Sequence, residues 1–144
     1  MKEVDESIKL LFHYAAICDK ALFSSGQISV NGMTVTVLRE PLGVIAVVCT
    51  AGPCNALVDF ITLLGAALAY GNTCVVAAHP DCAPPALELS QLLEAAEVPP
   101  GVVNILSGAT LALLPTLCGH MEINAVWCIG KLEYILYRAF SVFL

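Results

Sequence analysis

Residues 43–49 read Gly-Val-Ile-Ala-Val-Val-Cys, a continuous apolar run rich in β-branched side chains. A run without polar alternation is typical of a strand that is covered on both faces, as strands of parallel sheets are. The breaker pair Gly52-Pro53 and the favourable N-cap Asn55 follow it, and they predict that a helix occupies residues 56–70. This stretch therefore opens a strand–turn–helix unit.

The same alternation continues along the chain. Gly71-Asn72 is a typical helix end, and residues 73–78 form a second buried apolar run. A further helix is predicted over residues 84–97 and a third strand over residues 102–106. Strands that alternate with helices of about ten to fifteen residues predict an α/β fold with a parallel sheet and right-handed crossover helices.

The first forty residues are organised differently. Apolar side chains recur there at helical spacing, and they predict a helix with one apolar face made by Val4, Ile8, Leu11, Phe12 and Ala15. Charged residues, Glu3 among them, are expected on the other faces of this helix.

A β-hairpin is predicted after this helix. Runs at residues 27–30 and 33–37 flank Asn31-Gly32, and both positions of such a turn require a positive φ that Asn and Gly tolerate. Two roles remain open for the hairpin: a contact arm toward another subunit or domain, or a solvated surface hairpin.

The composition is unusually apolar. The chain is 58% hydrophobic and 12% charged, against about 25% charged residues in an average soluble domain. This excess predicts apolar surfaces that a partner covers. The apolar stretches at residues 61–70 and 102–106 are shorter than the roughly 20 residues of a membrane-spanning helix. We therefore expect no membrane span, and the charged start of the chain is unlike a signal peptide.

The cysteines and the net charge argue against a metal site and against a nucleic-acid partner. The seven cysteines include no Cys-x-x-Cys pair, which favours reduced, mostly buried thiols in a cytoplasmic protein. Cys118 and His120 are two residues apart without a second ligand pair nearby, so no metal site is expected. A net charge of −6, with no Lys or Arg from residue 40 to residue 130, argues against a nucleic-acid partner.

Three landmarks point to a family. Residues 39–44 read Arg-Glu-Pro-Leu-Gly-Val, residues 66–73 read Ala-Ala-Leu-Ala-Tyr-Gly-Asn-Thr, and residues 99–108 read Pro-Pro-Gly-Val-Val-Asn-Ile-Leu-Ser-Gly. In this order and at this spacing, they resemble the coenzyme-binding domain of the aldehyde dehydrogenases. Residues 122–130 are similar to the fourth strand of that domain and its glycine turn.

The resemblance implies an organisation. It implies a helix and an oligomerisation arm in residues 1–40, an incomplete Rossmann-like coenzyme core in residues 41–130, and an apolar tail in residues 131–144. It also implies NAD(P) as the cofactor and a protein partner or homo-oligomer. Within the superfamily, residues 38–49 and 125–127 are most similar to the degenerate second module of the two-module family 16 proteins.

The resemblance also places candidate coenzyme residues, and several depart from the family pattern. Gly52 falls where active members carry an asparagine that stabilises an oxyanion, and glycine has no side-chain donor. Asn55 could substitute for it, but the N-cap role already explains Asn55. His79 and Asp81 fall where a lysine and a following glutamate or serine hold the adenosine ribose; a loop histidine and a solvated aspartate are the plainer interpretation.

Two glycines complete this degenerate coenzyme site. Gly108 closes the third landmark, and Gly130 is the one glycine that remains of the family's Gly-x-Thr-x-x-Gly turn. Leu132 and Ile135 stand where that turn has small residues, so they would crowd a ligand.

No catalytic residue is assigned. The family's nucleophilic cysteine and general-base glutamate belong to a region that these residues do not match. Cys54 precedes the expected helix at residue 56, where a helix dipole lowers a thiol pKa, but a buried small residue is its default role. The tail of residues 131–144 is either a last amphipathic helix or a membrane or partner anchor.

Two functions therefore stay open. The first is an interaction or regulatory module without chemistry of its own. The second is part of a working NAD(P)-dependent aldehyde dehydrogenase that oxidises aldehydes to acids.

Overall fold

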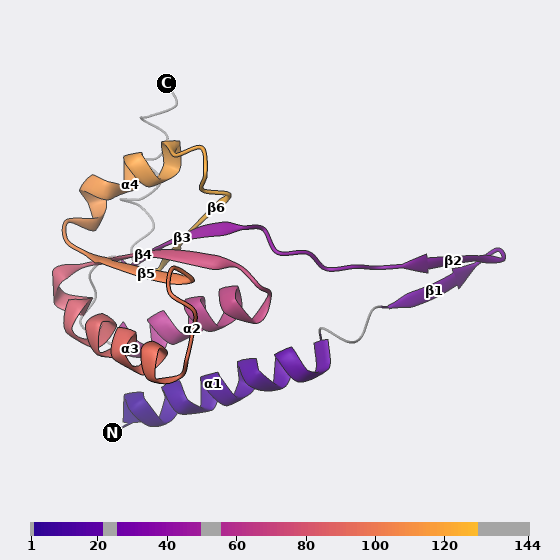
Figure 1. Cartoon of the computed structure of the whole chain (residues 1–144), viewed down its shortest axis with the longest axis horizontal. Helices are drawn as coiled ribbons and strands as arrows, with labels where there is room; N and C mark the ends of the chain where they lie inside the picture. The colour runs from indigo at the N-terminus through magenta and orange to yellow at the C-terminus, as the bar shows by residue number, and fades with distance from the viewer. Residues whose placement is uncertain (1, 22–25, 50–55, 130–144) are drawn as a thin grey trace.

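The computed structural model describes residues 2–21, 26–49 and 56–129. Figure 1 shows a layered body from which a thin arm projects. The elements, in chain order, are α1 (Lys2–Ala21), β1 (Gln27–Val30), β2 (Met33–Thr36), β3 (Val44–Cys49), α2 (Ala56–Ala69), β4 (Thr73–Ala78), a short 3-10 helix (Pro80–Cys82), α3 (Ala83–Ala95), β5 (Val103–Ser107), α4 (Thr110–Gly119) and β6 (Ala125–Ile129).

Four parallel strands form the main sheet, in the order β5-β4-β3-β6. β3 lies between β4 and β6, with Ile45 opposite both Cys74 and Ala125. β4 in turn pairs with β5, with Cys74 opposite Val103. The predicted parallel α/β fold is confirmed, and β3 is buried from Ile45 to Cys49, as its unbroken apolar run indicates.

Helices cover both faces of this sheet. Alternate residues of β3 point to opposite sides, so Ile45 and Val47 join one core with Phe60 of α2, whereas Ala46 and Val48 join a second core with Leu114 of α4. α1, α2 and α3 lie on the first side and α4 on the second, as Figure 1 shows. The connection from β5 to β6, which contains α4, therefore lies on the opposite face of the sheet from α2 and α3.

The predicted strand at residues 73–78 is confirmed, and the predicted helix over residues 56–70 agrees with α2 to within one residue. The predictions for α3 and β5 differ from the structure by one or two residues at each end. α4 was missed, because Pro115 interrupts its pattern and its apolar residues are spread around the helix. The spacing of its buried residues Thr110, Leu114 and Leu117 is the signal that could have revealed it.

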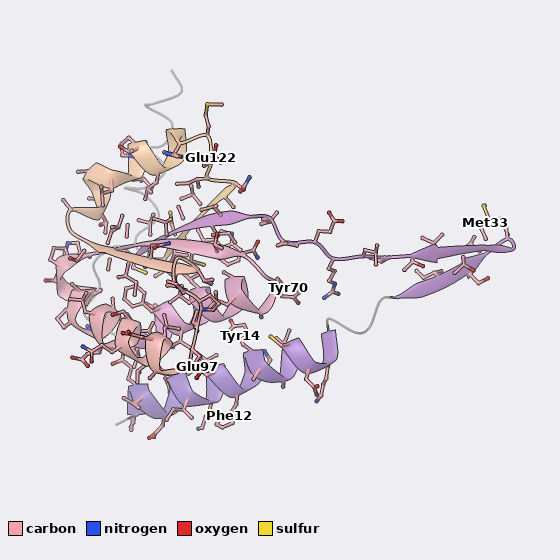
Figure 2. All side chains as sticks on the ribbon, in the orientation of Figure 1. Phe12, Tyr14, Met33, Tyr70, Glu97 and Glu122 are labelled. Carbon is pink, nitrogen blue, oxygen red and sulfur yellow. The ribbon has the colours of Figure 1, made fainter. Side chains whose placement is uncertain are left out.

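The first helix exists as predicted, but a different face is covered. Ser7, Leu10 and Tyr14 lie on the face toward α2, and Ser7 is 4% exposed. The apolar stripe of α1, which we define as Val4, Ile8, Leu11, Phe12 and Ala15, is exposed, with Phe12 at 73%. Figure 2 shows Tyr14 between α1 and α2, and Phe12 on the far side of α1.

The hairpin prediction is confirmed. β1 and β2 pair in antiparallel register, with Val30 opposite Met33, and the turn residues have positive φ, 50° at Asn31 and 80° at Gly32. The hairpin projects well away from the sheet, with Met33 near its tip (Figure 2). Its apolar side chains are exposed, among them Ile28, Val30, Met33 and Val35.

Two asparagines fix the start of β3. Asn72 is 6% exposed; its Oδ1 accepts from the N–H groups of Leu42 (2.6 Å) and Gly43 (3.1 Å), and its Nδ2 donates to the Ala67 carbonyl (3.1 Å). Asn124, just before β6, accepts the Val44 N–H through Oδ1 at 2.9 Å. Gly43 has a φ of 117° and lies so close to the Asn124 side chain that a Cβ would clash with it. The Gly-Asn landmark at residues 71–72 therefore has a structural role, because Asn72 joins the segment before β3 to the end of α2.

Candidate functional site

The carboxyl ends of the four parallel strands meet at one edge of the sheet, which we call the carboxyl edge. Its strand ends are Cys49, Ala78, Ser107 and Ile129. The chain runs outward from β3 through β4 to β5 and then returns to β6 beside β3. Ligands of such sheets bind outside the carboxyl ends where the strand order reverses, which here lies between β3 and β6.

Backbone hydrogen bonds hold two candidate residues at this edge. The His79 N–H donates to the Cys49 carbonyl at 3.2 Å, and the Gly108 N–H donates to the Ala78 carbonyl at 3.1 Å. Gly108 has a φ of 156°, a conformation that favours glycine, and it carries the chain from β5 toward α4. The fold therefore places His79 and Gly108 directly after the ends of two neighbouring strands, β4 and β5.

His79 and Asp81 contact each other. Asp81 donates its N–H to His79 Nδ1 at 3.3 Å, and Asp81 Oδ2 lies 3.2 Å from the same nitrogen. Nδ1 accepts the N–H when it carries a lone pair and pairs with the carboxylate when it is protonated, so these contacts belong to different protonation states. When Nδ1 accepts the Asp81 N–H, His79 is the N-cap of the 3-10 helix that begins at Pro80.

A carboxylate from another part of the chain reaches α2, the helix that follows β3. The Leu57 N–H, in the first turn of α2, donates to Glu3 Oε1 of α1 at 2.8 Å. Asp59 lies in the same turn, and burial, with a smaller contribution from Glu3, raises the pKa of its carboxyl group above the usual 3.8. Sequence reasoning missed this role of Glu3, since no local signal links residues so far apart.

The segment that builds the carboxyl edge is acidic. Residues 40–130 contain seven carboxylates and no Lys or Arg. Two of these carboxylates, Asp59 and Asp81, stand in the first turns of helices that follow β3 and β4. A phosphate group approaching this edge therefore meets negative charge without a compensating cation from this segment.

The buried thiols of the sheet are suited to packing. Cys49 is 3% exposed, and burial, followed by the nearby Cys82, Asp59 and Cys128, raises its pKa to about 12. Burial also raises the pKa of Cys74, to about 11, and that of Cys128. These thiols are protonated at neutral pH and are poor nucleophiles.

Several candidates lie outside the described residues: Gly52, Gly130, Cys54, Asn55 and the tail of residues 131–144. Among the residues that the structure describes, no three His, Cys, Asp or Glu side chains are grouped so as to hold a metal ion. None of the described helices is both long enough and apolar enough to cross a membrane.

A pocket of about 450 Å³ lies elsewhere. It is lined by Ser90, Leu93, Glu94, Val98, Pro99, Pro100, Gly101 and Val103. Because residues 98–101 precede β5, this pocket lies toward the amino-terminal edge of the sheet. It contains none of the candidate coenzyme residues.

Comparison with known proteins identifies relatives of this arrangement. The sequence profile described as "Aldehyde dehydrogenase family" matches residues 1–135. "Aldehyde dehydrogenase, cytosolic 1" of Mus musculus is 36% identical over 132 residues, which are 91% of this chain and 26% of that protein. The chain therefore spans about a quarter of the length of this relative.

Solved structures share the fold. The NAD-dependent aldehyde dehydrogenase from Sinorhizobium meliloti superposes with a TM-score of 0.82 at 19% identity, over 98% of this chain and 28% of its own. PnpE in complex with nicotinamide adenine dinucleotide superposes with a TM-score of 0.81 at 24% identity, over 98% of this chain and 29% of its own. At such identities, the likeness supports the Rossmann-like fold alone.

Proposed function

This chain belongs to the aldehyde dehydrogenase family, and from that premise we propose that it is a coenzyme-domain module that no longer binds coenzyme productively. In this proposal it is a pseudoenzyme that serves as an interaction or regulatory domain in the cytoplasm. The mouse relative is named as cytosolic, which supports the location. Within the family, we place it with the degenerate second module of the family 16 proteins, on the wording of residues 38–49 and 125–127.

One observation carries the proposal: the carboxyl edge has carboxylates where a dinucleotide needs donors and cations. The segment of residues 40–130 has no Lys or Arg. Asp81 and His79, at the position of the ribose-binding pair, satisfy each other. Glu3 already accepts the Leu57 N–H at the start of α2. The lack of cations and these two contacts all weaken the attraction for a pyrophosphate or a ribose.

The described residues therefore fit NAD(P) poorly. Gly108 still offers the open backbone that close approach of a ligand requires, since a Cβ there would meet no atom of the described residues within 4 Å. The family's lysine has no counterpart at residues 76–81, and a dinucleotide would have to displace contacts already made within the chain. We therefore derive no chemical step through NAD(P).

Exposed apolar surfaces support the docking role. The apolar stripe of α1 and the hairpin arm expose large side chains, among them Phe12 at 73% and Met33 at 68%. Such surfaces are typical of protein contacts when they are contiguous. A second copy of this chain, or an aldehyde dehydrogenase module, is the partner that we propose, with no role for nucleic acid.

A second function has its own support. PnpE has been solved with nicotinamide adenine dinucleotide on the same fold, and residues 99–108 keep the family landmark that leads to Gly108. The alternative is thus a part of a working NAD(P)-dependent aldehyde dehydrogenase. It requires that Gly52, His79, Asp81, Gly108 and Gly130 hold the coenzyme.

Coenzyme titration separates the two functions. We expect the 144-residue chain to show no aldehyde oxidation and no NAD binding tighter than millimolar by isothermal titration calorimetry. The variant His79→Ala serves as the matched probe of the ribose position, and it should give the same flat titration as the unmodified chain. Micromolar NAD affinity that His79→Ala weakens would overturn the proposed function and favour the enzyme fragment.

A further inference from the structure

A pocket lies between the end of α3 and the start of β5, and we call it the α3–β5 pocket. Its volume of about 450 Å³ falls within the range of roughly 300–1,000 Å³ that is usual for small-molecule sites. All of its lining residues lie between Ser90 and Val103, and the structure describes each of them. Because the pocket lies away from the carboxyl edge, a ligand bound there leaves the candidate coenzyme residues untouched.

One wall of this pocket is a rigid turn. Glu97 and Gly101 have positive φ, 57° and 86°, and between them residues 99–100 are prolines, whose rings fix φ. The N–H of Val98 donates to the carbonyl of Leu93 at 3.1 Å and ties the turn to α3. Figure 2 shows Glu97 at the end of α3, where this turn begins. The wall is therefore preorganised, which lowers the entropy that a ligand loses on binding.

The polar side chains of the lining are hydrogen-bond acceptors. Ser90 donates its hydroxyl proton to the Leu87 carbonyl at 2.6 Å, which leaves its oxygen as an acceptor. The other polar side chain is the carboxylate of Glu94, and the remaining lining residues are apolar or glycine. The two prolines have no N–H, and the N–H of Val98 is already bonded. A ligand that bonds to these side chains must therefore be a donor.

The pocket is also negatively charged. Glu94 is the one charged residue of its lining, and within the described part of the chain its carboxylate has no hydrogen-bond or ion-pair partner. Glu94 stands in the last turn of α3, where the helix dipole is negative, and this turn has no basic residue. Residues 40–130 supply no Lys or Arg either. The charge of the pocket therefore favours a cation.

We propose that the α3–β5 pocket binds a small organic cation, a protonated amine carried on an apolar body. The Glu94 carboxylate and the Ser90 oxygen accept hydrogen bonds from the ammonium group. Leu93, Val98 and Val103 contact the apolar body, whose burial supplies most of the affinity. The ammonium group supplies the selectivity, because neutral and anionic analogues leave the carboxylate unpaired.

Three probes of similar shape test the preference for a cation. They are 2-phenylethylammonium, its neutral analogue 2-phenylethanol, and the anion phenylacetate. The amide resonances of Val98 and Gly101 in the ¹⁵N-labelled full chain are the readout, because both residues line the pocket.

We expect 2-phenylethylammonium to shift both resonances and to bind about threefold to fivefold more tightly than 2-phenylethanol, the upper range for an exposed ion pair. Phenylacetate should bind most weakly. The proposal is wrong if the ammonium does not shift these resonances, or if its affinity is no higher than that of the alcohol.

Two variants on the same helix locate the charge. Glu94→Gln keeps the size of the side chain and removes its charge, so the affinity for the ammonium should fall to that for the alcohol. Glu88→Gln is the matched control, because Glu88 is an exposed carboxylate of α3 outside the pocket lining, and it should change nothing. Equal effects of the two variants would exclude Glu94 as the partner of the cation and contradict the proposal.

A third variant tests the pocket itself. Ser90→Leu places a larger apolar side chain in the cavity, and because Ser90 is exposed on α3 the helix should tolerate the change. Both the ammonium and the alcohol should then bind at least about threefold more weakly, since they compete with the new side chain for the same apolar contacts. Unchanged affinities in Ser90→Leu would show that the probes bind elsewhere and would overturn the proposal.

Discussion

The aromatic ring of Tyr14 lies directly against the Cα of Gly65, where α1 crosses α2. A Cβ built on Gly65 would overlap ring atoms of Tyr14. The same tyrosine donates its hydroxyl to the Thr62 carbonyl, one turn earlier in α2. The absence of a side chain at Gly65 thus sets how closely the two helices approach, and this approach brings Glu3 to the start of α2.

Substitution Gly65→Ala should destabilise the fold. Overpacking costs about 1–3 kcal/mol, of which the better helix propensity of alanine returns about 1 kcal/mol. We expect a net loss of about 1 kcal/mol in urea unfolding followed by circular dichroism. Gly119→Ala is the matched control, because a Cβ at Gly119 meets no atom within 4 Å in the described part of the chain. Equal stability of the two variants would contradict the close contact.

Substitution Asn72→Ala should destabilise the fold at the start of β3. The change removes the acceptor for the N–H groups of Leu42 and Gly43, and each unsatisfied group costs about 1–3 kcal/mol when water cannot replace the acceptor. Because this region is partly exposed, we expect a total loss of about 1–3 kcal/mol in the free energy of unfolding. Asn104→Ala is the control: Asn104 is exposed and donates locally to the Gly101 carbonyl.

Asp59 should make stability depend on pH. Its pKa is raised in the folded chain, by burial first and by Glu3 second, so the folded state binds more protons than the unfolded state between pH 3.8 and the raised pKa. Stability therefore falls as the pH rises from 3.8 through the raised pKa. We expect Asp59→Asn to be more stable than the unmodified chain at pH 7 and to lose this slope in urea titrations.

Substitution of the exposed carboxylate Glu88 is the control for this experiment. Glu88→Gln, on α3, should leave the pH slope unchanged. A slope that survives in Asp59→Asn would show that another group causes it.

Deletion of residues 28–37 should weaken ordered self-association. These residues form most of the hairpin arm, whose apolar side chains are exposed and whose edges offer unpaired backbone groups. We expect the unmodified chain to associate at tens of micromolar in light scattering and the deletion to reduce its mass. A soluble monomer that the deletion leaves unchanged would contradict the docking role.

Substitution Phe12→Asp tests the apolar stripe of α1 separately. Phe12 points away from α2 and is 73% exposed, so the change should reduce association without loss of stability. Met121→Asp is the matched control, because Met121 is 96% exposed and lies outside the stripe. Equal scattering from the two variants would exclude the stripe as a contact surface.

Much of the fold could be predicted from local patterns. The runs at residues 43–49 and 73–78 are almost wholly apolar because strands covered on both faces favour apolar side chains. The turn at Asn31-Gly32 was predictable because positive φ is a steric property of the residues themselves. The missed helix α4 contains Pro115, which reads locally as a helix breaker, although burial of Leu114 and Leu117 against the sheet stabilises it.

The candidate site, like the fold, was predictable from the sequence only in part. The sequence by itself determined that strand ends would meet at one edge and that residues 40–130 bring no cation to it, because both follow from element order and composition. Only the tertiary structure decided which face of α1 is covered and that Glu3 reaches Leu57. The physical reason is that local sequence shows only which contacts a helix face or a helix end is able to make. The contacts that form depend on the packing of Tyr14 on Gly65, which sets how α1 lies on α2.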